Sequence, residues 1–195
     1  QEFREMKRVG TPAIRLFHAD VYEGFEDMWA AIKRFAQGHN SQYYNMYGVM
    51  NTPRDDLYHR SVTDADIAYR DWLLIDIDRA YTAKCPASDE EIEHAKKLAN
   101  QIKKFMSQQG WPDPLEVMSG NGVHLYYDLN RMPSDEEATT LIKTFLNLLA
   151  DYFDNEYVKV DRSVYNASRI TKVLGTIARK GEESTDRPYR EAKLI

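Results

Sequence analysis

The sequence is poor in cysteine, in long apolar runs and in net positive charge. Each shortage argues against a class of site or of protein. Cys85 is the only cysteine among the 195 residues. A single cysteine excludes an intramolecular disulfide and a cysteine-built zinc site, and it fits a reducing compartment. No apolar run approaches the ~20 residues of a transmembrane helix, and no signal-peptide pattern is visible. We therefore expect neither membrane association nor export.

The charge balance argues against a protein that binds nucleic acid without specificity. The formal net charge is -5, whereas such binders are normally basic. The distribution of charge is more informative than its sum, because residues 162–181 contain no acid and five basic side chains: Arg162, Arg169, Lys172, Arg179 and Lys180. The hydrophobic content of 43% and charged content of 29% are ordinary for a globular chain.

The most informative stretch is 71–78, with the sequence DWLLIDID. Side chains alternate across a strand, so Asp76 and Asp78 point to one face while the apolar residues between them point to the other. Two carboxylates on one face repel each other, and a divalent cation with oxygen ligands relieves that repulsion. The pattern predicts half of a metal site, and the remaining chain must supply a third oxygen ligand.

The first fifty residues predict a β-α-β unit. Alternation indicates strands at 12–18 and 42–50, and the apolar residues between them recur at helical spacing. We expect Asp20 to cap this helix and Gly38 to end it. This N-terminal subdomain spans 1–50.

A polar connector is expected at 51–70, followed by a catalytic subdomain at 71–181 and a basic, polar segment at 182–195, all within one domain. The order β-α-β-β-α-β indicates an α+β fold of the RRM-like or ferredoxin-like type, a four-stranded antiparallel sheet with both helices on one face. The expected elements are a strand at 71–78, a helix at 88–109, strands at 115–118 and 123–129 joined by a Gly-rich hairpin turn, a helix at 134–154 and a strand at 157–161.

Alternation also predicts which polar side chains share the open face of this sheet. The expected set is Asp76, Asp78, Glu116, Met118, His124, Tyr126, Asp128, Tyr157, Lys159 and Asp161. The strand that ends at Asp161 should run antiparallel to the strand of Asp76. We therefore expect the two strands to continue to about Tyr81 and Val164, so that Asp161 lies beside Asp76.

Three motifs in this order resemble the catalytic domain of the archaeo-eukaryotic primase (AEP) superfamily, particularly the primase-polymerase domains of phage, plasmid and CRISPR-associated systems. They are Asp76-Ile77-Asp78; Ser119-Gly-Asn-Gly-Val-His124; and Val160-Asp161 with the segments 162–169 and 172–175. The resemblance spans roughly residues 70 to 181. This chain has Gly122 where many members have the serine of a Ser-x-His motif, which removes one hydroxyl contact to phosphate.

The resemblance implies template-dependent nucleotidyl transfer from ribo- or deoxyribonucleoside triphosphates such as ATP, GTP or dNTPs to a 3′-hydroxyl on single-stranded DNA. Two Mg²⁺ or Mn²⁺ ions would be held by Asp76, Asp78 and Asp161, which together with His124 form the expected catalytic set. The expected nucleotide-binding residues are Ser119, Gly120, Asn121, Gly122, His124, Arg169 and Lys172.

The resemblance also implies partners and a location. The expected partners are a DNA template and primer, and a helicase, an accessory helical domain or a CRISPR-associated domain outside this chain. The expected location is the cytoplasm of a bacterial, archaeal or phage-infected cell.

Two other classes of function stay open at this point. A non-catalytic or degenerate nucleic-acid-binding module of replication could use the same fold, but it would favour aromatic residues on the open face and a basic total charge. A HAD-type phosphatase also uses an Asp-x-Asp motif after an apolar strand. It would need Gly-Thr shortly after Asp78 and a parallel sheet, whereas Arg79-Ala80-Tyr81 follows here.

Overall fold

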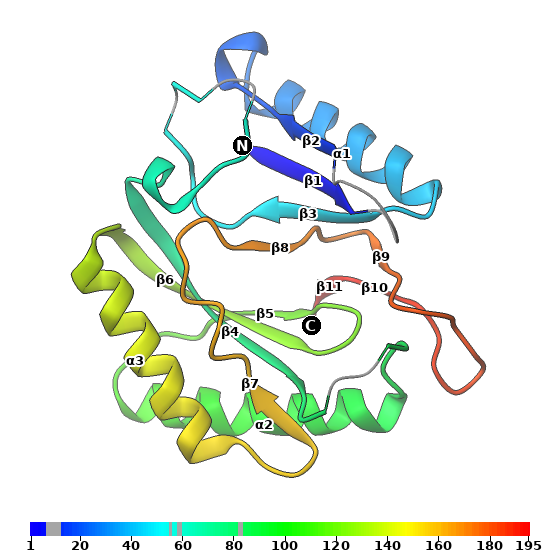
Figure 1. Ribbon diagram of the computed structural model, residues 1–195, viewed down its shortest axis with the longest axis vertical. Coiled ribbons are helices and arrows are strands. Elements are labelled where there is room, and N and C mark those ends of the chain that lie inside the picture. The colour runs from blue at the N-terminus through cyan, green and yellow to red at the C-terminus, as the bar shows by residue number, and fades with distance from the viewer. Residues whose placement is uncertain (7–12, 55, 58–59, 82–83) are drawn as a thin grey trace.

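A computed structural model describes residues 1–6, 13–54, 56–57, 60–81 and 84–195. The fold is α+β, with two larger antiparallel sheets that lie one above the other in Figure 1 and a small two-stranded sheet. α1 lies at the top of that view, and α2 and α3 lie at the bottom. Within the described residues, no helix is both long and apolar enough to cross a membrane.

The lower sheet has five strands in the order β11-β5-β6-β4-β7. Without β11 this is the RRM-like order, and the prediction of that topology is confirmed. α2 contacts β4 and β6, while α3 contacts β7 and α2. The elements are β4 (Tyr69–Arg79), α2 (Asp89–Gln108), β5 (Leu115–Met118), β6 (Val123–Pro133), α3 (Glu136–Phe153), β7 (Val158–Val160) and β11 (Lys193–Leu194).

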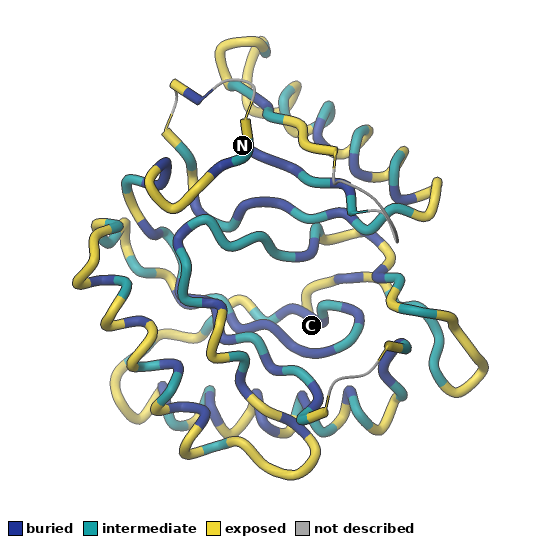
Figure 2. The backbone as a smooth tube through the Cα atoms, in the orientation of Figure 1, coloured by how far each residue is buried: buried dark blue, intermediate teal, exposed yellow. Residues whose placement is uncertain are grey.

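The apolar sides of these strands and helices form the main core. Ile75, Ile77 and Leu125 are fully buried there, against Leu98 and Ile102 of α2. Figure 2 shows the same pattern along the backbone, with buried residues concentrated in the strands. α2 begins as predicted, because the Ser88 hydroxyl accepts from the Glu91 amide in a capping box. The core therefore fixes β4 rigidly, and the side chains on its opposite face take defined positions.

The upper sheet has the order β2-β1-β3-β8. It contains the predicted strands as β2 (Ala13–Leu16) and β3 (Asn45–Val49), with α1 (Phe25–Ser41) between them; position 12 of the predicted first strand lies outside the described residues. Sequence reasoning missed β1 (Glu2–Met6), which pairs with both β2 and β3.

Two details of α1 differ from prediction. A short 3₁₀ helix, Ala19–Val21, takes the place of the expected first turn, and Gly24 rather than Asp20 caps α1. Gly38 does not end the helix, because the chain turns only at Tyr43, whose φ of 68° is left-handed.

The segment after β7 was predicted to hold no further strand, but it crosses between the sheets. β8 (Ile170–Lys172) pairs with β3 of the upper sheet, and β11 pairs with β5 of the lower one. Between them, β9 (Ile177–Ala178) pairs with β10 (Arg190–Glu191). The basic segment 162–181 therefore runs beside the open face of the lower sheet.

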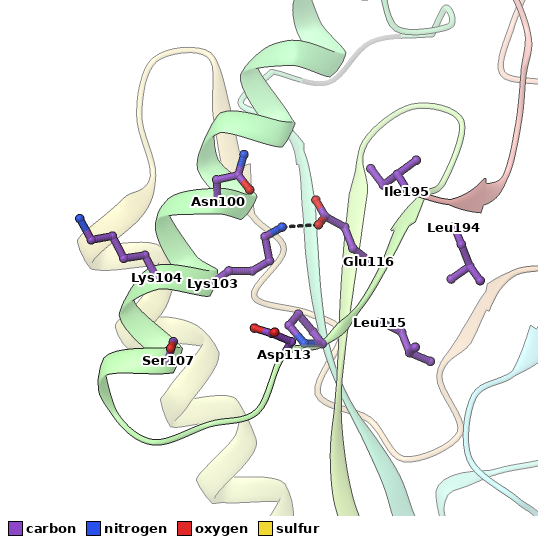
Figure 3. Close-up of a pocket in the computed structure, with 10 residues that line it drawn as sticks. Asn100, Lys103, Lys104, Ser107, Asp113, Leu115, Glu116, Leu194 and Ile195 are labelled. Carbon is purple, nitrogen blue, oxygen red and sulfur yellow. Dashed lines mark hydrogen bonds and ion pairs between the residues drawn. The ribbon is translucent and has the colours of Figure 1, made fainter.

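The prediction for the faces of β5 was wrong. Val117 pairs with His124, so it lies on the open face, and Glu116 and Met118 lie on the helix side. Figure 3 shows Glu116 pointing toward Lys103 of α2, with which it forms an ion pair. Met118 packs against Ile92. The four-residue pattern LEVM is compatible with either orientation of the strand. Contacts with α2 determine which of its side chains face the helices.

The predicted strand extensions were also wrong, although the alignment they were meant to achieve is present. β4 ends at Arg79 and β7 at Val160. The register pairs Ile77 with Val160, and the Asp161 amide donates to the Asp76 carbonyl at 2.8 Å. Asp161 therefore lies beside Asp76 without a longer strand.

The stretch 51–70, predicted to be a polar connector, contributes buried residues to a small core. Leu57, Val62 and Ile67 are buried together with Val49 and Ala167 in a small core of their own. Asp66 is buried, accepts hydrogen bonds from Arg60 and Thr63, and forms a capping box with Thr63 at the short 3₁₀ helix Asp64–Asp66.

Candidate active site

A cavity of about 520 Å³ lies between the two sheets. Its lining comes from β3, β4, the β5–β6 turn, β6, β8 and the residues that follow β9. Polar and charged side chains line it on both sides: Asn45, Tyr47, Asp76, Asp78, Ser119, Asn121, His124, Arg169, Thr171, Lys172, Arg179 and Lys180. Most of the predicted site residues are therefore brought together.

One side of the cavity, which we call the acid wall, carries Asp76, Asp78 and His124. The Asp76 Oδ1 atom is buried and makes no hydrogen bond within the described residues. It lies 3.4 Å from the His124 Nε2 atom. Burial and the neighbouring Asp76 charge raise the pKa of Asp78 to about 6. The two carboxylates repel each other in a partly desolvated place, as the sequence pattern predicted.

His124 is held by its neighbour two residues along β6. Its Nδ1 atom lies 3.1 Å from the Tyr126 hydroxyl, which leaves Nε2 facing Asp76. Burial opposes the charged imidazolium, but Asp76 and Asp78 outweigh burial and raise the pKa of His124. The acid wall thus carries a histidine at ion-pair distance from a carboxylate.

The glycines of the β5–β6 turn have packing roles that the sequence did not reveal. A Cβ atom on Gly122 would lie 2.2 Å from the Ile77 carbonyl oxygen and 2.8 Å from Asp78 Oδ1. Gly120 has a φ of +102°, and a Cβ there would lie 2.3 Å from the Cβ of Ala178. The turn therefore packs directly against the Asp78 carboxylate and against β9.

The other predicted residues of this turn are engaged in holding it. The Ser119 hydroxyl donates to the Gly122 carbonyl, and the Asn121 side-chain oxygen accepts from the Ala87 amide. Both residues line the cavity, so a role in nucleotide binding stays a prediction for them.

The opposite side, the basic wall, carries Arg169, Lys172, Arg179 and Lys180. The Arg169 Nε and Arg179 Nη1 atoms are buried and have no hydrogen-bond partner among the described residues. The guanidinium of Arg179 lies 4.9 Å from the centre of the Tyr43 ring. Arg179 and Lys180 were not among the predicted site residues, and the acid-free run 162–181 was the signal that could have placed them here.

Lys172 is the most enclosed of these cations, with 7% of its surface exposed. Its Nζ atom donates to the Asn45 Oδ1 atom at 2.6 Å and lies 4.8 Å from the centre of the Tyr47 ring. Burial and the nearby Arg179 lower the pKa of Lys172 to about 7. Sequence reasoning missed Asn45 and treated Tyr47 as an ordinary strand residue, because neither has a local motif.

Asp161 lies in an adjoining cavity of about 200 Å³, which shares Asp78 and Lys180 with the first. Its Oδ1 atom accepts from the Ser163 amide at 2.8 Å, so Asp161 also caps the following turn. Within the described residues, no three acidic, histidine or cysteine side chains converge as a complete metal-binding group. A role for Asp161 as third ligand stays a prediction.

The acid wall itself suits a hard divalent cation. Asp76 and Asp78 offer only carboxylate oxygens, and one of those oxygens is buried with no hydrogen bond. Mg²⁺ is commonly held by one or two carboxylates together with water and substrate phosphates. Asp76 and Asp78 together therefore fit such an ion.

The remaining basic side chains near this region hold the fold. Arg162 pairs with Asp151 and Asp154 at the end of α3. Arg187 makes two hydrogen bonds to Glu91, which fastens the C-terminal segment to the start of α2. The basic run therefore divides between the cavity and the outer surface.

A second cavity, of about 640 Å³, lies between α2 and the β5–β11 edge (Figure 3). Two acidic residues, Asp113 and Glu116, line it, and Glu116 is already paired with Lys103. It offers less chemistry than the cavity between the sheets.

Comparisons with known proteins support the fold alone. No family model matches the chain, and no curated protein matches it significantly. Among solved structures, the chain is similar to the AEP domain of the primase-polymerase of cyanophage S-2L, with a TM-score of 0.55, 16% identity, and coverage of 100% of this chain and 79% of that one.

Two further structures are similar. One is the primase RepB', with a TM-score of 0.52, 12% identity, and coverage of 100% of this chain and 50% of that one. The other is the polymerase domain of Mycobacterium tuberculosis Ligase D, solved in complex with DNA, with a TM-score of 0.52, 15% identity, and coverage of 96% and 62%. The chain thus spans about half to four fifths of these proteins, and its fold is similar to that of their primase and polymerase domains.

Proposed function

We propose that the chain is a DNA primase-polymerase that adds ribo- or deoxyribonucleotides to a 3′-hydroxyl on a single-stranded DNA template. The fold is compatible with this activity but does not by itself establish it. The chemistry of the cavity between the sheets carries the proposal.

The central observation is that buried atoms of charged side chains on both walls of one cavity have no hydrogen-bond partner within the described residues, although Asp76 Oδ1 has an ion-pair partner in His124 Nε2 at 3.4 Å. Asp76 Oδ1 is on the acid wall, and Arg169 Nε and Arg179 Nη1 are on the basic wall. Such atoms are costly unless a ligand completes them. A ligand that complements both walls must bring a cation and a polyanion, which is the composition of a metal-bound nucleoside triphosphate.

The residues then take distinct roles. Asp76 and Asp78 hold Mg²⁺ or Mn²⁺, and Asp161 contributes from the adjoining cavity. When bound, the metal activates the 3′-hydroxyl and neutralises charge on the triphosphate. Arg169 and Lys172 bind phosphate oxygens, since charge-assisted hydrogen bonds are strong where water is excluded.

The β5–β6 turn and His124 complete the nucleotide site. His124 lines the cavity and keeps its Nε2 atom 3.4 Å from Asp76 Oδ1. Backbone amides of the turn, together with Ser119 and Asn121, supply neutral contacts. A DNA template and primer would bind outside the cavity, and a helicase or an accessory domain would belong to a longer protein.

The alternatives are weaker on specific grounds. Every strand pairing in the described residues is antiparallel, whereas a HAD-type phosphatase needs a parallel sheet. A non-catalytic RRM-like module would present aromatic rings on the open face to stack bases. Here Asp76, Asp78 and His124 share that face with Tyr126, a half-buried aromatic residue whose hydroxyl lies 3.1 Å from His124 Nδ1.

The experiment that tests the proposal is extension of a labelled primer on single-stranded DNA with Mg²⁺ or Mn²⁺ and each nucleotide set. We expect template-directed extension by the wild-type chain and none by an Asp76→Asn, Asp78→Asn variant. Asp128→Asn is the matched control, because Asp128 is exposed on β6 outside the cavity lining. Absence of metal-dependent nucleotide binding in the wild-type chain would contradict the proposal.

A further inference from the structure

The buried ammonium of Lys172, on the basic wall, depends on one neutral side chain from a distant part of the sequence. Asn45 begins β3, and its Oδ1 atom accepts from the Lys172 Nζ atom at 2.6 Å and from the Arg179 amide at 2.8 Å. Its Nδ2 atom donates to the Arg179 carbonyl at 2.7 Å. One amide therefore fixes both the ammonium of Lys172 and the backbone of Arg179.

The setting of Lys172 makes this contact important. An enclosed ammonium loses its hydration and needs acceptors to replace it. Within the described residues, the Asn45 oxygen is the one hydrogen-bond acceptor recorded for Lys172 Nζ, and the Tyr47 ring adds a face-on contact. Without Asn45 the ammonium would have no fixed position in the cavity.

The chemical type of the acceptor is as informative as its place. A carboxylate at position 45 would hold Lys172 equally well, but it would cancel the positive charge that an anionic ligand requires. An amide oxygen orients the ammonium through a dipole and leaves its charge uncompensated. The arrangement therefore suits a site in which the counter-charge is supplied by the ligand.

We propose that Asn45 is a positioning residue for the triphosphate, holding Lys172 and Arg179 in place against it while leaving their charge free. The inference rests on the proposed function and adds a residue that none of the sequence motifs contains. Asn45 itself acts through Lys172 and Arg179, which touch the ligand.

The titratable and charged groups around Lys172 determine in which direction its pKa should change in each variant. Tyr47 comes from β3, and Asp76, Asp78 and His124 line the same cavity from β4 and β6, while Arg169, Arg179 and Lys180 lie on its own side. Burial and Arg179 lower the pKa of Lys172 to about 7. Loss of the Asn45 oxygen lowers that pKa further, and a carboxylate in its place raises it.

Asn40 provides a matched control. It lies near the end of α1, and its side chain donates to the Ile177 carbonyl at 3.0 Å and accepts from the Ile177 amide at 2.9 Å. Asn40, which also donates to the Tyr44 carbonyl at 2.9 Å, therefore ties β9 to the end of α1 as Asn45 ties Arg179 to β3, and within the described residues no hydrogen bond joins its side chain to Lys172. A purely structural role predicts the same consequences for both asparagines.

The test compares Asn45→Ala, Asn45→Asp, Asn40→Ala and Lys172→Met with the wild-type chain. Calorimetry would measure Mg²⁺-dependent affinity for a nucleoside triphosphate from pH 6 to 9, and NMR would follow the Lys172 amine in each variant. We expect Asn45→Ala and Asn45→Asp each to lose about 10-fold or more in affinity, as for loss of a charge-assisted contact. The Lys172 pKa should fall in the first variant and rise in the second.

The double variant Asn45→Ala, Lys172→Met separates positioning from folding. If Asn45 acts mainly through Lys172, the double variant binds much as Lys172→Met does, because the two losses are not additive. Asn40→Ala should keep nearly wild-type affinity. Equal losses in Asn40→Ala and Asn45→Ala, or an Asn45→Ala chain that binds normally, would overturn this inference alone. A wild-type chain that binds no nucleotide would overturn the proposed function as well.

Discussion

The two walls of the cavity differ in how the chain builds them. The acid wall comes from β4 and β6, which are adjacent antiparallel strands on one rigid core. The basic wall joins β3 to β8, and the contact between Asn45 and Lys172 spans 127 positions of the sequence. Both walls are therefore built on paired antiparallel strands, but the strands of the basic wall come from much more distant parts of the sequence.

The walls also differ in how they tolerate buried charge. The acid wall leaves Asp76 and Asp78 facing each other, and the pKa of Asp78 rises to about 6 as a result of burial and repulsion. The basic wall supports its cations with neutral groups, namely the Asn45 amide and the Tyr43 and Tyr47 rings. His124 pairs with only one of the two carboxylates of the acid wall, and the basic wall has no acidic partner among the groups that support it, so the two walls suit opposite ends of one ligand.

The largest effect should come from removing the charge of the acid wall. The double substitution Asp76→Asn, Asp78→Asn should lower primer extension by about 1000-fold or more, because a bound metal contributes several kcal/mol to the transition state. Thermal unfolding should show a melting temperature equal to or above wild type, since a repulsive pair is removed. A large fall in melting temperature would show instead that the acids stabilise the fold.

A smaller effect should follow from Lys172→Met on the basic wall. Nucleotide affinity should fall by about 10- to 100-fold, because a contact from a charged donor is lost. Stability should not fall, because burying the ammonium is unfavourable and methionine fills similar space. Titration calorimetry and a melting curve on the same sample would measure both quantities, and unchanged affinity would remove Lys172 from the site.

The pH dependence of stability gives a third comparison. The folded-state pKa of Asp78 lies above its ordinary value, so the folded chain binds more protons and its stability falls as the pH rises from about 4 to 6. Asp78→Asn should abolish this loss, with a gain of about 1–3 kcal/mol above pH 6 and almost none below pH 4. Denaturant titrations at pH 4 and pH 7.5 would measure it. A gain of equal size at both pH values would contradict the account.

The smallest effect should come from Arg162, which belongs to the same basic run but lies outside the cavity. Arg162→Ala removes exposed ion pairs with Asp151 and Asp154, so the free energy of unfolding should change by less than about 1 kcal/mol. Nucleotide affinity should remain at the wild-type value. Loss of affinity comparable to that of Lys172→Met would mean that the whole run 162–181 binds the ligand.

The same contrast explains how much the sequence could predict. Asp76, Asp78 and His124 were placed correctly because alternation fixes the face of a long strand with one apolar side. Glu116 was misplaced because β5 has only four residues, and its face depends on Lys103 and Ile92 in α2.

The basic wall was beyond local reasoning. The charge run 162–181 was visible, but nothing in it shows that Arg179 turns into the cavity while Arg162 pairs with α3. Asn45 and Asn40 resemble any polar residue beside a helix or strand, because their partners lie more than a hundred residues away. The close packing of Gly122 against the Ile77 carbonyl likewise depends on strand register rather than on motif.

The most direct test of the two-wall account is calorimetric binding of a nucleoside triphosphate with and without Mn²⁺, in the wild-type chain, the Asp76→Asn, Asp78→Asn variant and the Lys172→Met variant. The account predicts binding by wild type only with Mn²⁺, no Mn²⁺-dependent binding by the acid-wall variant, and weakened but still Mn²⁺-dependent binding by Lys172→Met. Nucleotide binding that is independent of Mn²⁺, or unaffected by both substitutions, would contradict it.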